Sequence, residues 1–556
     1  MTAQETSQAL RWRWTSVSAG RLAFVLIVAF ALFNLVGLDR MPLVNQDEPW
    51  IAEPGLHFWQ TGVFASELHR GFFGVERHFL LHAPLYSITV GGVIALLGPG
   101  LYQARLLSLA LATATAALTF ALGRRLFSPR HGLIAVLMLT VWRIAPGIKA
   151  YPSGIPLVDL GRLSRYDIGV PVLTVTACLL VLPLMTTVPS PPLTRGAVAR
   201  LLMAGALVGI GVSCHPAALA WVPMIWAGLL VTRGWRDGLR PCAWVAAGLL
   251  AGLLPYAAWI ASGWRDFLLQ QEYVADRYEL FDPIFYLGNV WQEWRRYGQI
   301  GRGLLSLQPG AWLIVTSGLV GVLALWRRRA EDAAGPRVLL AAVVVGAGLF
   351  TLGMKPKLYY YLATLWPVLA LTAAVGLLAL LRASSRIVRV ATVVMMVAAC
   401  ADGLRGWNLV TFRALSVPPY HELCDRLAAA IPPDSRVLAL PHYWFGLAPR
   451  VRMYRSLFGP MLFVSPTFEA RHPPLATLLD AADANVLVLD PPMLAFLKDA
   501  HDPTTMSYGF ARSASALQAY LATHSQRVVT VDVPAYGHFE IHFLRPWPAA
   551  AQTTAP

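Results

Sequence analysis

Apolar runs about as long as a membrane is thick recur along this chain and constrain its fold more than any other feature. A helix that crosses a bilayer needs about 20 apolar residues. Such runs lie near 21–38, 85–98, 105–123, 131–148, 168–186, 198–213, 217–232, 241–261, 308–326, 338–353, 358–381 and 387–402. Charged residues make up only 13% of the chain, against about 25% in soluble domains. The sequence therefore predicts a polytopic membrane protein and excludes a cytosolic enzyme, a DNA-binding factor and a disordered chain.

The net charge of +15 is better explained by topology than by nucleic-acid binding, because basic loops stay on the cytoplasmic side of a membrane. Arginine clusters do lie between the apolar runs. If 85–98 crosses the membrane, every later cluster falls on the wrong side; if it is interfacial or re-entrant, every cluster falls inside. With about 14 residues, this run is short for a span. We therefore expect eleven spans, within a range of about 11–13 transmembrane helices.

This topology predicts the domain organisation. Residues 1–20 form a cytoplasmic N-terminus ahead of an uncleaved first span, because no small-residue cleavage site follows that span. Residues 21–404 form the transmembrane module, with interfacial helices in its first outer loop. Its outer loops are 39–104, 147–167 and 262–307. Residues 405–548 form a small α/β domain on the outer face, and residues 549–556 form a disordered tail.

Within the C-terminal domain, local patterns predict individual elements. Tyr420–Ala430 has helical spacing and is stopped by two prolines. The short apolar runs Arg436–Leu440 and Asn485–Leu489 are typical of buried strands, and 527–544 predicts a hairpin. The five cysteines have no disulfide or zinc spacing. No internal repeat, P-loop or dinucleotide fingerprint is present.

Carboxylates occur at the membrane boundary of two outer loops. Asp47 and Glu48 follow the first span, and adjacent carboxylates close to a bilayer are costly to desolvate. They suit a general base that takes a proton from an acceptor hydroxyl; the alternative is a solvated loop pair. Asp167 follows Arg165 and Tyr166 at the same predicted depth. It could share a substrate, a cation or an arginine with Asp47, or simply begin a helix.

Lysines are concentrated at one outer turn. The chain has only four, and Lys355 and Lys357 stand together just before Tyr359, Tyr360 and Tyr361. This placement runs against the positive-inside trend and favours a clamp on a lipid phosphate, with the tyrosines at headgroup level. Ordinary interfacial snorkelling is the alternative.

The order of these motifs resembles the GT-C superfamily of polyprenyl-phosphate-sugar glycosyltransferases, on the ArnT-like and protein-mannosyltransferase-like branch. The resemblance covers roughly residues 20–400. It rests on the following sequence of motifs: Asp47-Glu48, His82-Ala83-Pro84-Leu85-Tyr86, Arg105, Arg165-Tyr166-Asp167, His215-Pro216, and Lys355 to Tyr361 leading into Trp366-Pro367. One departure is His82, where the family often has a lysine; a fixed positive charge is replaced by a titratable group.

The resemblance implies inverting transfer of a sugar from a polyprenyl-monophosphate donor, such as undecaprenyl or decaprenyl phosphate, to an acceptor hydroxyl on the extracytoplasmic face. Asp47 is the expected general base, and Asp167 and Glu48 are the further candidate catalytic residues. The expected substrate-binding residues are Lys355, Lys357, Arg105, Arg165, His82, His215, Tyr359 and Tyr361. No cofactor is required and no metal ligands are assigned. The acceptor would be a glycan, lipid or protein, and the expected location is a bacterial inner membrane.

Three alternatives remain open from the sequence. A transporter or flippase of a lipid-linked sugar would also need outer cations and aromatic residues, but more often shows repeat symmetry. A non-catalytic scaffold of a cell-envelope assembly would not depend on Asp47. A transferase that uses a diphosphate donor would be expected to bind a divalent cation.

Overall fold

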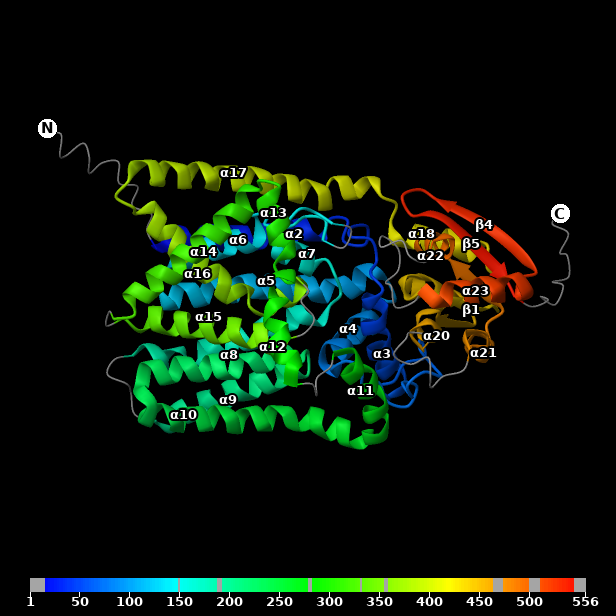
Figure 1. The fold of residues 1–556 in the computed structure, drawn as a ribbon, viewed down its shortest axis with the longest axis horizontal. Helices are drawn as coiled ribbons and strands as arrows, with labels where there is room; N and C mark the ends of the chain where they lie inside the picture. The colour runs from blue at the N-terminus through cyan, green and yellow to red at the C-terminus, as the bar shows by residue number, and fades with distance from the viewer. Residues whose placement is uncertain are drawn as a thin grey trace, which may run out of the picture.

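A computed structural model describes residues 16–148, 151–187, 193–278, 283–330, 333–354, 359–463, 474–499 and 511–544. Its larger part is a bundle of long helices that run side by side (Figure 1). The bundle contains α2 (Ser16–Leu35), α5 (Leu101–Leu126), α6 (Pro129–Thr140), α8 (Gly169–Thr186), α9 (Arg195–Val212), α10 (Trp221–Ser262), α14 (Pro309–Arg328), α15 (Ala334–Gly353), α16 (Trp366–Leu381) and α17 (Arg386–Val410).

The helices of the bundle correspond to the predicted spans. Eight helical segments of the described chain are long and apolar enough to cross a membrane. One of them includes α10, which holds two predicted spans on either side of a break at Gly234, where φ is 77°. The remaining two predicted spans are the shorter helices α6 and α16, and α16 is buried over most of its length. The prediction of a polytopic helical fold is confirmed.

The run 85–98 forms α4 (Pro84–Leu97), which lies with α3 (Asp47–Thr61) between the bundle and the C-terminal unit (Figure 1). Glycines allow these two helices to pack with their backbones in contact. A Cβ placed on Gly91 would lie 2.0 Å from the carbonyl carbon of Gly55. The interfacial arrangement expected for the first outer loop therefore has a packing reason as well as a length reason.

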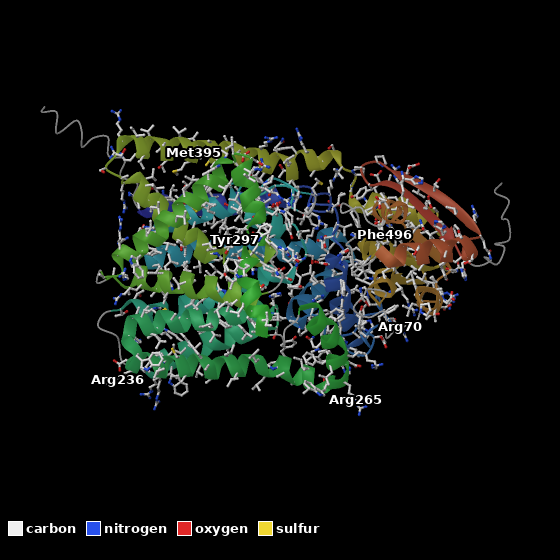
Figure 2. All side chains as sticks on the ribbon, in the orientation of Figure 1. Arg70, Arg236, Arg265, Tyr297, Met395 and Phe496 are labelled. Atoms are coloured by element: carbon white, nitrogen blue, oxygen red, sulfur yellow. The ribbon has the colours of Figure 1, made fainter. Side chains whose placement is uncertain are left out.

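The segments between the long helices add short helices at the same end of the bundle. They are α7 (Pro156–Gly161), η1 (Tyr166–Ile168), η2 (Pro216–Ala220), α11 (Trp264–Tyr278), α12 (Pro283–Trp291), η3 (Glu293–Arg295), α13 (Gly298–Leu305) and η4 (Tyr359–Thr364). Figure 2 shows Arg265, at the start of α11, toward the C-terminal unit, and Arg236, between the two halves of α10, at the opposite end. We refer to the end that faces the C-terminal unit as the outer end, the side on which the charge distribution predicts these loops.

The C-terminal unit is a five-stranded mixed sheet with helices packed on it. The strands are β1 (Arg436–Ala439), β2 (Met453–Ser456), β3 (Val486–Leu489), β4 (Arg527–Val533) and β5 (Gly537–Phe543). Their order is β2-β1-β3-β5-β4, with β1 parallel to β2 and β3 and the other pairs antiparallel. The helices are α18 (Tyr420–Ala429), α19 (Trp444–Leu447), α20 (Phe458–Phe463), α21 (Leu475–Ala481), α22 (Pro491–Lys498) and α23 (Ala511–His524).

The predicted helix, both predicted strands and the hairpin of this unit are confirmed, whereas β2 was not predicted. The unit rests on the first outer loop. The amide of Ser456 at the end of β2 donates to the carbonyl of Leu68 at 2.8 Å, and Phe458 packs edge-on against Trp50 of α3 with ring centroids 5.5 Å apart. The predicted disordered tail lies outside the described residues.

Candidate functional site

Two buried arginines fix the loop that leads from the first span to Asp47. Arg162 donates to the carbonyl oxygens of Asn34, Val36, Gly37 and Met41 at the end of α2 and just beyond it. Arg105 donates to the carbonyls of Leu38 and Pro42 at 2.7 and 2.9 Å. The last carbonyls of a helix have no intrahelical partner and attract positive charge. Residues 34–42 are thereby held against α5 and α7, and α3 begins at a fixed place.

Glu48 is the counter-charge of Arg105. Its Oε1 accepts from Arg105 Nε and the Ser164 amide, and its Oε2 accepts from Arg105 Nη2 and the Asn45 amide, each at 2.8 Å. Both side chains are fully buried. Both oxygens of Glu48 are occupied, and the carboxylate links α3, α5 and the loop before η1. Two residues predicted to be catalytic or substrate-binding are thus bound to each other.

Asp47, the first residue of α3, lies next to this pair but has different surroundings. Arg165 donates from Nη1 to Asp47 Oδ2 and, at 2.9 Å, from Nε to Asp167 Oδ2. The side chains of Arg165 and Asp167 are buried, whereas that of Asp47 is 33% exposed. Although burial opposes its charge, the carboxylates of Asp167 and Asp47 hold the pKa of Arg165 well above its ordinary value. The predicted carboxylates of the two outer loops therefore meet on one arginine.

Each of these carboxylates keeps one oxygen that is not bonded. Among the described residues, Asp47 Oδ1 has no hydrogen-bond partner and is the oxygen of the more accessible group. Asp167 Oδ1 is buried and also lacks a partner within hydrogen-bond distance in the described chain. The nearest ring nitrogen, His215 Nε2, is 3.9 Å from it. A small acceptor or a sugar hydroxyl could use both free oxygens.

Aromatic rings surround the arginine. The guanidinium carbon of Arg165 lies 3.8 Å from the ring centroid of Tyr360 in η4. Tyr166 stacks on His215 with ring centroids 5.1 Å apart, and His215 also contacts Tyr361 at 5.4 Å. Burial lowers the pKa of His215 below its ordinary value, which favours a neutral ring. Flat aromatic faces next to a cation and carboxylates are suited to stacking against a sugar ring.

The remaining predicted site residues fall into three groups. His82 lies between Trp50 and Tyr166, with ring centroids 5.7 and 5.4 Å away. Tyr359 is buried against Trp366 and Tyr151 rather than open to a ligand. Lys355 and Lys357 lie outside the described residues, although Arg296 fixes the chain just before them by donating to the carbonyls of Phe350 and Met354.

Sequence reasoning missed Tyr151 and the part played by Arg162. Tyr151 pairs with Ile148 in a short bridge of the second outer loop. Its ring contacts Tyr359 and Tyr360, at 5.9 and 6.3 Å between centroids. A single tyrosine in a loop gives no periodic signal. Arg162 belongs to none of the sequence motifs; the available clue was the length and charge of its side chain, which suit helix-end carbonyls.

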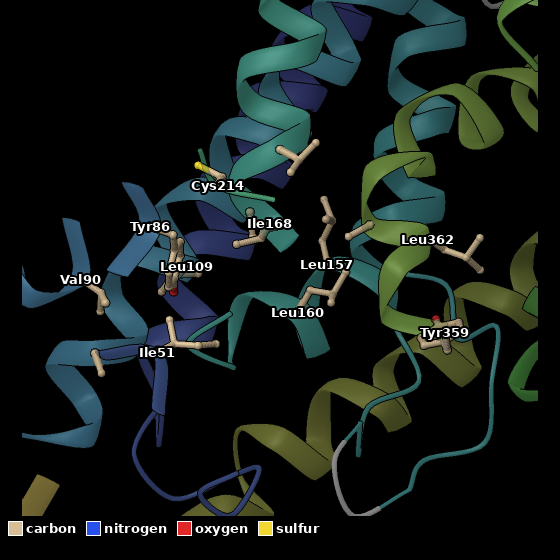
Figure 3. Close-up of a cluster of buried hydrophobic side chains, with 14 of the residues drawn as sticks. Ile51, Tyr86, Val90, Leu109, Leu157, Leu160, Ile168, Cys214, Tyr359 and Leu362 are labelled. Carbon is tan, nitrogen blue, oxygen red and sulfur yellow. The ribbon is translucent and has the colours of Figure 1, made fainter. Parts of the chain in front are cut away.

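The elements that carry the site also contribute to a layer of buried apolar side chains (Figure 3). It includes Ile51 of α3, Leu109 of α5, Leu160 of α7 and Ile168 of η1, all nearly inaccessible to solvent. Tyr86 of α4 enters the same layer and its hydroxyl lies 2.6 Å from Ser108 Oγ. Burial of this layer fixes the four elements whose outer ends carry the charged groups.

No cluster of three or more His, Cys, Asp or Glu side chains arranged to hold a metal ion is found in the part of the chain that the structure describes. At the candidate site, the two carboxylates are instead bridged by Arg165.

The comparisons with known proteins find similarity in fold but no match in sequence. No protein-family model and no curated protein matches the chain. Among solved structures, ArnT from Cupriavidus metallidurans in the apo state is 13% identical with a TM-score of 0.55, covering 93% of this chain and 97% of that one. The same protein bound to undecaprenyl phosphate is 15% identical with a TM-score of 0.54 over the same shares.

A second similar structure is the Archaeoglobus fulgidus oligosaccharyltransferase AglB in complex with an inhibitory peptide and a dolichol-phosphate. It is 13% identical with a TM-score of 0.54, and the match covers 96% of this chain and 75% of that one. At these identities the likeness concerns the fold. The chain has the GT-C fold that the order of its motifs led us to expect.

Proposed function

We propose that this protein is a membrane glycosyltransferase that moves a sugar from a polyprenyl-monophosphate donor to an acceptor hydroxyl at the outer end of the bundle. The observation that carries the proposal is the shared contact of Arg165 with a buried Asp167 and a partly exposed Asp47. A fold shared with proteins solved with undecaprenyl phosphate and dolichol-phosphate supports the donor class.

In the proposed reaction the acceptor oxygen attacks the anomeric carbon of the sugar. The new bond joins the acceptor oxygen to that carbon, the bond from the carbon to the phosphate oxygen breaks, and polyprenyl phosphate leaves with the electron pair. Attack opposite the leaving group inverts the anomeric centre. The acceptor proton passes to the free Oδ1 of Asp47, a role worth about 10²–10⁴-fold in rate.

Asp167 and the cations have complementary roles in this proposal. Asp167 lies within a buried, ordered cluster and would orient the acceptor or stabilise positive charge that develops on the sugar. Lys355 and Lys357 would neutralise the departing phosphate, because fixed cations in a partly dry site stabilise developing negative charge strongly. Glu48 and Arg105, which satisfy each other, would position Asp47 instead of touching substrate.

The test is transfer by the Asp47→Asn variant from a polyprenyl-phosphate sugar, measured beside direct binding of polyprenyl monophosphate. We expect turnover to fall by about 10²–10⁴-fold while binding of the lipid phosphate stays near the wild-type level. Asp434→Asn is a matched control, because Asp434 is an exposed residue of the C-terminal unit. Normal turnover in Asp47→Asn would refute the assignment of the base.

Binding of polyprenyl monophosphate also tests the donor class. Lys355→Ala combined with Lys357→Ala is expected to weaken it, whereas Asp434→Asn is not. A wild-type protein that does not bind this lipid would refute the monophosphate-donor proposal.

A further inference from the structure

A cavity of about 550 Å³ lies beside the candidate site, at the outer end of α17. Three parts of the chain form its walls: the loop before α3, residues 143–148 with Pro152, and α17 with the residues that follow it. Ala535, in the turn between β4 and β5, adds a contact from the C-terminal unit. The cavity therefore lies where the bundle, the two outer loops and the sheet meet.

The polar lining of this cavity is cationic. Its lining residues include Arg143, Arg405 and Arg413, together with Asn408, and among these described residues there is no aspartate or glutamate. Arg143 is neutralised by Asp402, 3.0 Å away on α17. Arg405 and Arg413 are exposed, and neither makes a side-chain hydrogen bond or ion pair with any other described residue. Two uncompensated guanidinium groups thus border one cavity, and their planar forks match phosphate or carboxylate oxygens.

The depth of these arginines places them at the edge of an apolar surface. Val390, Val393, Val397 and Leu404 form an exposed stripe along α17, between 50% and 70% accessible. Phe412, next to Arg413, is 65% exposed. A stripe of this kind on a predicted membrane helix contacts lipid chains. The arginines begin where the stripe ends, which is the level of lipid headgroups.

The cavity is close to the carboxylate cluster, and the described elements next to the predicted donor phosphate site do not line it. Its lining residue Leu43 precedes Asp47 by four positions, and Pro152 adjoins Tyr151, whose ring contacts Tyr360. Tyr360 in turn supports Arg165. None of the described residues of α15, η4 or α16, which flank Lys355 and Lys357, lines the cavity.

We propose that this cavity binds the anionic headgroup of a membrane lipid, and that this lipid is the acceptor of the sugar. The second half of the statement depends on the proposed glycosyltransferase function; the first half does not. Phosphate or carboxylate groups of the headgroup would contact Arg405 and Arg413, and the acyl chains would lie along the exposed stripe of α17. An acceptor hydroxyl carried by the same headgroup would reach Asp47 from the side opposite to the donor.

The binding experiment uses the full-length protein in detergent with dioctanoyl phosphatidic acid as the probe. Dioctanoyl phosphatidylcholine and inorganic phosphate serve as the neutral-lipid and free-ion comparisons. We expect Arg405→Glu combined with Arg413→Glu to weaken phosphatidic acid binding by about tenfold or more. Arg405→Gln with Arg413→Gln should give an intermediate loss. Arg452→Glu with Lys498→Glu, which changes the charge equally on exposed residues of the C-terminal unit, should leave binding unchanged.

Three results would overturn the lipid site. The first is that the wild type and the Arg405/Arg413 variants bind phosphatidic acid equally. The second is that the wild type binds phosphatidylcholine as well as phosphatidic acid. The third is that inorganic phosphate, at the same concentration as the lipid, competes with phosphatidic acid for binding. The last would mean a site for a free anion.

The acceptor assignment has its own readouts. The Arg405/Arg413 variants should bind polyprenyl monophosphate as wild type does, and loss of that binding would mean that the cavity holds the donor. Lipid binding by a protein that transfers no sugar would refute the proposed function and leave the lipid site. Transfer to an anionic lipid acceptor at the wild-type rate by the double variant would refute the acceptor role and leave the glycosyltransferase.

Discussion

Replacing Glu48 by glutamine tests whether this residue holds the site together, as its contacts indicate. Each carboxylate oxygen accepts two N–H groups, so either orientation of the glutamine amide would direct an NH₂ group at two donors. Arg105, fully buried, would also lose its counter-charge. Hydrogen bonds to charged groups are worth about 1.5–3 kcal/mol each, and breaking a buried ion pair costs about 3–5 kcal/mol. Because these contributions overlap, we expect a total loss of about 3–5 kcal/mol in unfolding free energy.

The assay is the free energy of unfolding in bicelles by steric trapping, with Glu422→Gln as the control. Glu422 makes the same kind of contact, to Arg426 at 2.8 Å on α18, but both side chains are more than 40% exposed. That substitution should cost less than about 1 kcal/mol. If Glu48→Gln costs no more than Glu422→Gln, the pair does not stabilise the fold and the argument for a positioning role fails.

Two other predictions concern single side chains. Arg165→Lys keeps the positive charge but loses the planar guanidinium group that binds both Asp47 and Asp167. Turnover in steady-state transfer assays should therefore fall by about 10²-fold. An unchanged rate would show that this bridge is dispensable. Burial raises the pKa of Glu53 from 4.5 to about 7, so the folded state binds a proton that the unfolded state has released, and stability should fall by about 3 kcal/mol as the pH rises from about 5 to about 8. Glu53→Gln imitates the protonated carboxyl, since its amide can donate to Ser66 Oγ while its oxygen accepts from the amides of Glu67 and Leu68. The unfolding free energy of this variant, measured at both pH values, should depend less on pH. An unchanged pH dependence would contradict the assignment of the effect to Glu53.

The spans and most of the sheet were predictable because their signals are local. Apolar length predicted the long helices, and the short length of 85–98 together with the distribution of the arginine clusters predicted that α4 is not a span. The strand β2 was missed because Met453–Ser456 is only four residues long, alternates buried residues with partly exposed ones such as Arg455, and follows the charged Arg452. Its strand conformation comes from pairing with β1 and from contact with the first outer loop.

The candidate site was predictable in its residue types but not in their pairing. Sequence placed Asp47, Glu48, Arg165 and Asp167 near one membrane boundary. It could not assign Glu48 to Arg105, 57 positions away, or Asp47 to Arg165, 118 positions away. Adjacent carboxylates have opposite environments because successive residues at the start of a helix point about 100° apart. The side chain of Glu48 is buried in the bundle, whereas that of Asp47 is partly exposed to solvent.

Several arginines at the outer end do not follow the positive-inside prediction, and their surroundings explain why. Arg105, Arg162 and Arg165 lie at the outer end and are almost completely buried. Their charges are compensated by carboxylates or by helix-end carbonyls, so they carry no topological information and instead hold the site in place. Arg405 and Arg413 follow neither pattern, since they are exposed, lie at the outer end and have no partner within the described chain. Because neither the positive-inside rule nor an internal ion pair accounts for these two cations, we infer that they bind an anion from outside the protein. At headgroup depth, the nearest source of such an anion is a lipid.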